Sequence, residues 1–268
     1  MKRYRTFLEI IIPIAIGLSL YAIMFYTDMF RIDKELTTLA QLYAQLVPDS
    51  QSPFTSKSFE IVTSVIWDQR GFDTYFETSV LYIAIIAAVG VATKAGKAIE
   101  ERLIHYREST IIVRLISRLV APIVVVVSVS IALHGHITPG GGFQGGSVFA
   151  IAPLLLMLAY SSSYISGREL KENRMLFMRG LGVTVIALTG LAPLIYYIAA
   201  SNYAYLFQNL AKPDSVFTYP ATIYLGFATM LLSGTLIIFN SMEYIAVLSG
   251  FTIALYYLTK YFEGGDSA

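Results

Sequence analysis

Apolar residues gather along this chain in long blocks that short polar stretches separate. Each block is about 20 residues long, the length of helix needed to cross the hydrocarbon layer of a membrane. Only Asn240 to Glu243 separates the last two blocks, so the final block either spans in a tight hairpin or ends as an interfacial helix. We therefore predict an all-α integral membrane protein with about seven transmembrane helices, at residues 6–27, 76–94, 112–133, 145–165, 180–200, 220–239 and 244–262.

The first long polar stretch, residues 28–75, contains one amphipathic segment. Its apolar side chains recur every three or four positions, which places them on one face of a helix; they are Leu36, Leu39, Leu42, Tyr43 and Leu46. We expect this helix to lie on the membrane surface. Pro48 and Pro53 should end it, because proline interrupts a helix.

The composition narrows the possible functions. Charged residues make up 14% of the chain, whereas soluble domains carry roughly 25%. The chain has no cysteine, which rules out disulfides, thiolate zinc sites and iron–sulfur ligation by its own residues. We expect it to hold no cofactor and to catalyse no reaction itself. The net charge of +1, without a basic run interleaved with aromatic residues, argues against a nucleic-acid partner.

The basic residues predict an orientation. Seven spans place 13 of the 19 Lys and Arg residues on the same side as the N-terminus, and basic loops favour the cytoplasmic side. We therefore expect a multi-pass protein of the cell membrane with its N-terminus in the cytoplasm. Lys2, Arg3 and Arg5 resemble the start of a signal peptide, but Tyr26-Thr27-Asp28 is no cleavage site, so we interpret the first block as a retained anchor.

A glycine-rich turn separates two of the apolar blocks. Irregular backbone at membrane depth requires protein or water to satisfy its polar groups, and glycine allows the close backbone approach that such a turn needs. Its distinctive residues are His134, Gly135, His136, Pro139, Gly140, Gly141, Gly142, Phe143, Gly145 and Gly146.

Several interpretations of this turn are open. A phosphate-binding loop would need a lysine before Ser147, and none is present. A metal site on His134 and His136 lacks a third ligand, because His105 is expected on the opposite face. An ion or proton path through His136 is a third possibility. The fourth is a tightly folded hairpin that packs against a neighbouring subunit.

A second polar motif precedes the second block and contains Asp68, Arg70, Gly71, Asp73, Thr74 and Glu77. Thr74 and Glu77 have the spacing of a capping box at a helix start, and Asp68 can pair with Arg70 in the loop. Asp73 and Glu77 are also four positions apart, on one helix face. Carboxylates at a membrane edge commonly mark an ion entry, so both a capping role and an ion path are possible.

Both motifs resemble a known family. The run GHITPGGGFQGG resembles the signature of the B-type subunit of Mrp-type sodium/proton antiporters (MnhB), in the form found in membrane-bound hydrogenase-type complexes. Residues 55–95 resemble the small membrane domain that ends the large A-type antiporter subunit, or its detached E-like counterpart, although Phe76 stands where glycine is common. Where the antiporter pattern has an aspartate, nine positions before Gly234-Thr235, this chain has Leu225.

The resemblance implies an E-like domain over residues 1–108 joined to a B-like domain over residues 109–268. It implies a non-catalytic membrane subunit of a Na+/H+-translocating module, inside a larger respiratory complex of the hydrogenase or sulfur-reductase type. The partners would be other membrane subunits, the lipid bilayer, and Na+ or H+. The alternatives are a purely structural spacer, a subunit of a stand-alone multisubunit antiporter, or an independent transporter.

Overall fold

The computed structural model describes residues 2–27, 37–47, 49, 52–99, 109–161 and 172–265. The chain divides into two compact units, Met1–Leu42 and Tyr43–Ala268. The first unit contains α1 (Lys2–Tyr26), and α2 (Thr38–Leu46) runs across the division. Both helices lie where the apolar pattern predicted them. From Ile11 to Tyr26, α1 exposes its side chains on all sides, so a lipid or protein environment must cover it.

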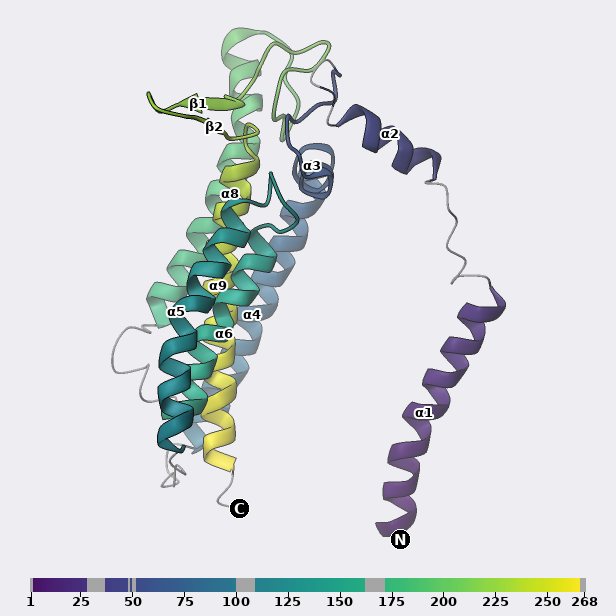
Figure 1. The fold of residues 1–268 in the computed structure, drawn as a ribbon, viewed down its shortest axis with the longest axis vertical. Coiled ribbons are helices and arrows are strands. Elements are labelled where there is room, and N and C mark those ends of the chain that lie inside the picture. Colours follow the sequence, from purple (N-terminus) through teal and green to yellow (C-terminus); the bar gives the residue numbers. More distant parts are fainter. Residues whose placement is uncertain are drawn as a thin grey trace. The chain divides into compact units, whose positions relative to one another are not determined.

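The second unit is a bundle of long helices, drawn side by side in Figure 1. Helix α6 packs between α5 and α9, while α9 also contacts α4 and α8. Among the five spanning helices, α9 has the largest buried share, so it forms the centre of the bundle. The helices are α4 (Gly71–Ile99), α5 (Ile111–Leu133), α6 (Gly142–Tyr160), α8 (Glu172–Ala200) and α9 (Leu236–Gly265).

These five helices are each long and apolar enough to cross a membrane. The outer face of α5 carries large exposed side chains such as Ile112, Leu119 and Val126, which is the pattern of a surface in contact with lipid or another membrane protein. The prediction of an all-α membrane fold is therefore confirmed. The described residues contain these five spans and the shorter apolar stretch Ile11–Tyr26, instead of the seven spans expected.

The span predicted at 220–239 is wrong. Residues in this block form strands β1 (Thr222–Tyr224) and β2 (Thr229–Leu231), an antiparallel pair that projects sideways in Figure 1. The block contains no charge, which is why its hydropathy resembles a span, but its local chemistry opposes a helix. Gly226 and Gly234 both adopt positive φ, and β-branched residues favour strands. One helix, α9, replaces the two spans and includes the block at 244–262.

One end of the bundle, which we call the hairpin end, gathers the irregular segments 52–70, 134–141 and 201–235. The first segment includes α3 (Ile61–Ser64) and the π-helical turn η1 (Val65–Gln69). Phe207 folds back between the helices, and its N–H donates to the Gly190 carbonyl over 2.9 Å. It joins an apolar cluster with Trp67, Ile186, Leu236 and Phe239. This cluster holds the irregular segments against the ends of α8 and α9.

Candidate functional site

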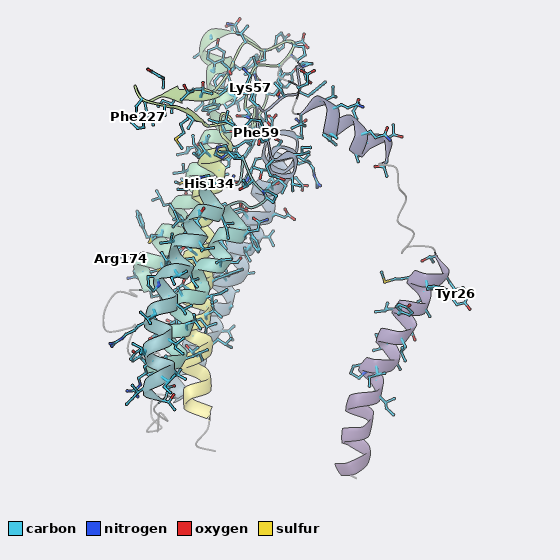
Figure 2. All side chains as sticks on the ribbon, viewed as in Figure 1. Tyr26, Lys57, Phe59, His134, Arg174 and Phe227 are labelled. Atoms are coloured by element: carbon cyan, nitrogen blue, oxygen red, sulfur yellow. The ribbon has the colours of Figure 1, made fainter. Side chains whose placement is uncertain are left out.

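The two motifs identified in the sequence meet at the hairpin end. The Ser58 hydroxyl donates to the His136 carbonyl over 2.6 Å, and the Thr63 hydroxyl donates to the Gly135 carbonyl over 2.7 Å. The Phe59 N–H also donates to the His136 carbonyl, over 3.2 Å. The segment before α4 therefore satisfies the carbonyls of the glycine-rich turn, as irregular backbone at membrane depth requires. Figure 2 labels Lys57, Phe59 and His134 in this region.

The two histidines of the turn point to different environments. His136 is 1% exposed, and its Nε2 lies 2.9 Å from the Leu231 carbonyl at the end of β2. Burial lowers the pKa of His136 below its ordinary 6.5, so the neutral ring with Nε2–H as donor fits this contact. His134 is exposed and bonds within its own helix turn. Among the described residues, no group of three or more potential metal ligands forms.

The glycines let α6 approach its neighbours. A Cβ at Gly145 would meet the Ser128 carbonyl of α5 at 2.7 Å, and one at Gly146 would meet Val247 Cβ of α9 at 2.7 Å. At Gly142 it would collide with the Asn240 carbonyl and approach Glu243 Cβ to 2.6 Å. Gly141 also adopts positive φ as α6 begins. The glycine-rich turn thus packs against α5, α9 and the 58–63 segment of the same chain.

The motif before α4 has a different geometry from the one predicted. Helix α4 begins at Gly71, so Thr74 lies inside its first turn, and its hydroxyl donates to the Ile66 carbonyl over 2.8 Å. Thr74 and Glu77 therefore form no capping box. Asp68 does not pair with Arg70 either. Arg70 pairs with Asp73 at the exposed surface, while the buried Asp68 pairs with Lys212 over 3.1 Å.

A cavity of about 400 Å³ opens where the glycine turn, α4 and α9 meet. The motif before α4 contributes Thr63, Ile66, Trp67, Thr74, Glu77 and Thr78, the glycine turn and the start of α6 contribute Gly140, Gly141, Phe143 and Gln144, and Leu81, Asn240, Glu243 and Val247 complete the lining. Glu77 is exposed, whereas Glu243 is 9% exposed. The cavity therefore runs from a carboxylate at the outer face of α4 to a second one inside the bundle.

Glu243 is held at the start of α6. The Phe143 N–H donates to Glu243 Oε2 over 3.1 Å, and the positive end of the helix dipole favours a carboxylate there. Glu243 and Glu77 lie close enough for their charges to interact. The neighbouring Asn240 is 1% exposed, and its Nδ2 has no hydrogen-bond partner. Of the residues predicted for an ion path, the cavity lining includes Glu77, but not Asp73 or His136.

Sequence reasoning missed Glu243, Asn240 and Lys212. The apolar block at 220–239 predicts a span, which would place Asn240 and Glu243 in a loop instead of the first turns of α9. The signal that was available is the pair Gly226 and Gly234, because glycines that flank a β-branched run favour a turn and strands. Lys212 gave no local signal, since its partner Asp68 is 144 residues away.

Comparison with known proteins matches residues 112–253 to the family described as domains related to the MnhB subunit of Na+/H+ antiporters. This region is more than half of the chain. The chain belongs to the MnhB-related family. Its MnhB-related region contains the glycine-rich turn and Glu243 but not Glu77.

Two curated relatives share this similarity. An uncharacterised protein of Methanocaldococcus jannaschii is 29% identical over 185 residues, which are 63% of this chain and 71% of the relative. The Na(+)/H(+) antiporter protein of the MnhB type from Bacillus subtilis is 30% identical over 90 residues, which are 34% of this chain and 62% of that protein. The similarity to the Bacillus protein thus spans less than two thirds of its length.

Two solved membrane complexes contain chains of the same fold. The first is the membrane-bound sulfane sulfur reductase, an archaeal respiratory membrane complex, with a TM-score of 0.65 and 21% identity over 93% of this chain and 99% of the matched one. The second is the Mrp complex from Dietzia sp. DQ12-45-1b, with a TM-score of 0.66 and 22% identity over 96% of this chain but 26% of the matched one. Both matches extend beyond the MnhB-related region and so include the motif around Glu77.

Proposed function

We propose that this chain is a non-catalytic membrane subunit of an Mrp-like Na+/H+-translocating module within a larger respiratory complex of the hydrogenase or sulfur-reductase type. The membership of the MnhB-related family supports the antiporter-like module. The end-to-end fold match with one chain of the sulfane sulfur reductase supports a respiratory host, because the Dietzia match covers only part of a longer chain. Redox chemistry would belong to other subunits.

We further propose that the chain joins two parts, an E-like domain over residues 1–108 and a B-like domain over residues 109–268. The family match begins at residue 112, which supports a boundary near this point. The cell membrane is the proposed location, with the N-terminus in the cytoplasm. Loss of the span at 220–239 moves Lys260 to the same side as most other basic residues, which strengthens the charge bias for this orientation.

The observation that carries the proposal is the cavity shared by Glu77 and Glu243. Glu243 has no cationic partner among the described residues and accepts one backbone hydrogen bond. A buried carboxylate without a counter-charge is stabilised by taking up a proton or a small cation, and ionisable groups inside membranes commonly mark such paths. Carboxylate and amide oxygens from Glu243, Asn240 and Gln144 suit a hard cation.

The exposed position of Glu77 supports a role within an assembly. Glu77 lies on the spanning helix α4, six residues after its start, which is roughly 9 Å along the helix. A charged side chain facing lipid at this depth is costly, so such residues usually face protein or a water-filled space. A neighbouring subunit that covers this face of α4 would remove that cost. This argues against an independent transporter.

The test is charge-neutral substitution in the intact complex. Glu77→Gln and Glu243→Gln should each lower Na+ uptake coupled to a proton gradient in native membrane vesicles, while the complex still assembles. Glu172→Gln is the matched control, because Glu172 lies at the opposite end of the bundle and bonds the Tyr257 hydroxyl. Unchanged transport in both cavity variants would instead support a purely structural spacer.

A further inference from the structure

Arg179 is a buried positive charge inside the bundle, although it lies on the spanning helix α8. It is 1% exposed, and its Nη1 donates to the Ala246 carbonyl of α9 over 2.7 Å. Its guanidinium lies 5.3 Å from the centre of the Tyr82 ring of α4. No carboxylate among the described residues pairs with it, and its Nε has no hydrogen-bond partner. The guanidinium thus joins α4, α8 and α9 by contacts that leave its charge uncompensated.

This charge lies just beyond the inner limit of the cavity. Val247 lines the cavity, and the preceding residue, Ala246, accepts the bond from Arg179. Ala246 and Gly250 follow the start of α9 by 10 and 14 residues, roughly 15–21 Å along the helix. This depth is near the middle of a hydrocarbon layer about 30 Å thick. Arg179 therefore lies at mid-membrane, on the route from the cavity toward the far end of the bundle.

The surrounding packing leaves this position no alternative route. A Cβ at Gly250 would collide with the Arg179 guanidinium, so the side chain fills the space in front of α9. A Cβ at Gly182 would meet the Met242 carbonyl at 2.5 Å, which shows how closely α8 approaches α9 beside the cavity. On the other side, Gly146 packs against Val247. The cavity is thus closed by close helix contacts and by a single fixed cation.

We propose that Arg179 is a selectivity residue that bars cations from crossing the seam between α4, α8 and α9. The inference rests on the proposed function and extends it. A positive charge in a low-dielectric interior repels cations strongly, and arginines exclude cations from other pores in this way. A cation that reaches Glu243 then leaves sideways, past the exposed Glu77, into a neighbouring subunit. This chain holds one half of the ion route, and the neighbour supplies the other half.

The experiment measures passive leak separately from coupled transport, in vesicles that contain the assembled complex. Arg179→Gln removes the charge but keeps a hydrogen-bond donor, and Arg179→Lys restores the charge. Arg179→Gln should raise passive Na+ leak about tenfold, which corresponds to about 1.4 kcal/mol in the barrier, and Arg179→Lys should not. Arg118→Gln is the matched control, because Arg118 also stacks on a tyrosine, Tyr160, but on the exposed face of α5.

A double variant links the leak to the cavity. Adding Glu243→Gln to Arg179→Gln should abolish the extra leak if cations reach the seam through the cavity. A fall in coupled transport without leak would contradict the proposal and make Arg179 a link in a through-path. Unchanged leak, or failure of Arg179→Gln alone to assemble, would reduce Arg179 to a structural residue. The proposed function falls separately, if Glu77→Gln and Glu243→Gln leave coupled transport unchanged.

Discussion

Lys212 Nζ lies 3.1 Å from Asp68 Oδ2, although 144 residues separate the two in the sequence. The Asp68 carboxylate is fully buried and Lys212 is 14% exposed. Burial raises the pKa of Asp68 above its usual 3.8, and the charge of Lys212 opposes that shift. The pair therefore attaches the loop after α8 to the turn that starts α4, beside the cavity.

Removing the cation of this pair should be more harmful than removing the acid. Lys212→Met leaves a buried carboxylate without a partner and should destabilise the fold by about 3–5 kcal/mol. Asp68→Asn should cost less, because Lys212 can still reach water. Thermal unfolding of the purified protein in detergent measures both. The double variant should recover part of the loss, and a double variant as unstable as the sum of the singles would contradict a direct interaction.

Gly142 should be intolerant of any side chain. An alanine there would meet Glu243 Cβ at 2.6 Å and Oε2 at 2.8 Å, so Gly142→Ala must displace the buried carboxylate or the start of α6. Overpacking of this kind costs about 1–3 kcal/mol, and we expect coupled transport to fall as well. Gly90→Ala is the control, because a Cβ there meets nothing within 4 Å. Equal behaviour of the two variants would refute this packing.

Phe207 should be essential for the hairpin end. Its ring covers Gly190 so closely that a Cβ there would meet it at 2.5 Å, and it belongs to the cluster around Trp67. Phe207→Ala should lower the free energy of unfolding by about 3–5 kcal/mol, the usual range for a buried phenylalanine. Phe227 at the tip of the β1–β2 hairpin (Figure 2) is 90% exposed. Phe227→Ala should leave the unfolding midpoint unchanged, and a comparable loss in both would contradict the burial.

His136 should make stability fall on acidification. Because burial lowers its folded pKa below 6.5, the unfolded state binds a proton first as the pH falls through 6.5. Stability from this residue is complete above that pH and decreases below it, by at most about 1.4 kcal/mol per pH unit. Unfolding midpoints between about pH 7.5 and 5.5 measure the effect, on either side of the ordinary histidine pKa. His136→Gln should flatten this dependence, and an unchanged slope would assign it to other groups.

The sequence predicted the spanning helices wherever apolar periodicity and length agree. Residues 112–133 match α5 to within one residue, because a continuous apolar run in lipid has few alternatives to a helix. The prediction for 220–239 was wrong because hydropathy measures transfer into an apolar medium and does not register local backbone preference. Gly226, Gly234 and the β-branched residues decide the structure there.

The candidate site was predictable only in part. The motif around Glu77 and the glycine-rich turn stood out by composition, and the structure brings both to one cavity. Their contact depends on pairs such as Thr63 with Gly135, which are 72 residues apart, and no local pattern specifies such a register. Glu243 and Arg179 each looked like an ordinary charge near a helix end. Their significance comes from burial, which depends on how α6 and α8 pack against α9.

The most direct test of the central claim is a double-mutant cycle on Glu77 and Glu243, measured as coupled Na+ uptake by the assembled complex. If the two carboxylates serve one ion site, Glu77→Gln and Glu243→Gln should each lower uptake about tenfold, and the double variant should be little worse than either single one, as for residues that act as a unit. Losses that multiply would mean two independent sites. No loss in any variant, with the complex intact, would contradict the account.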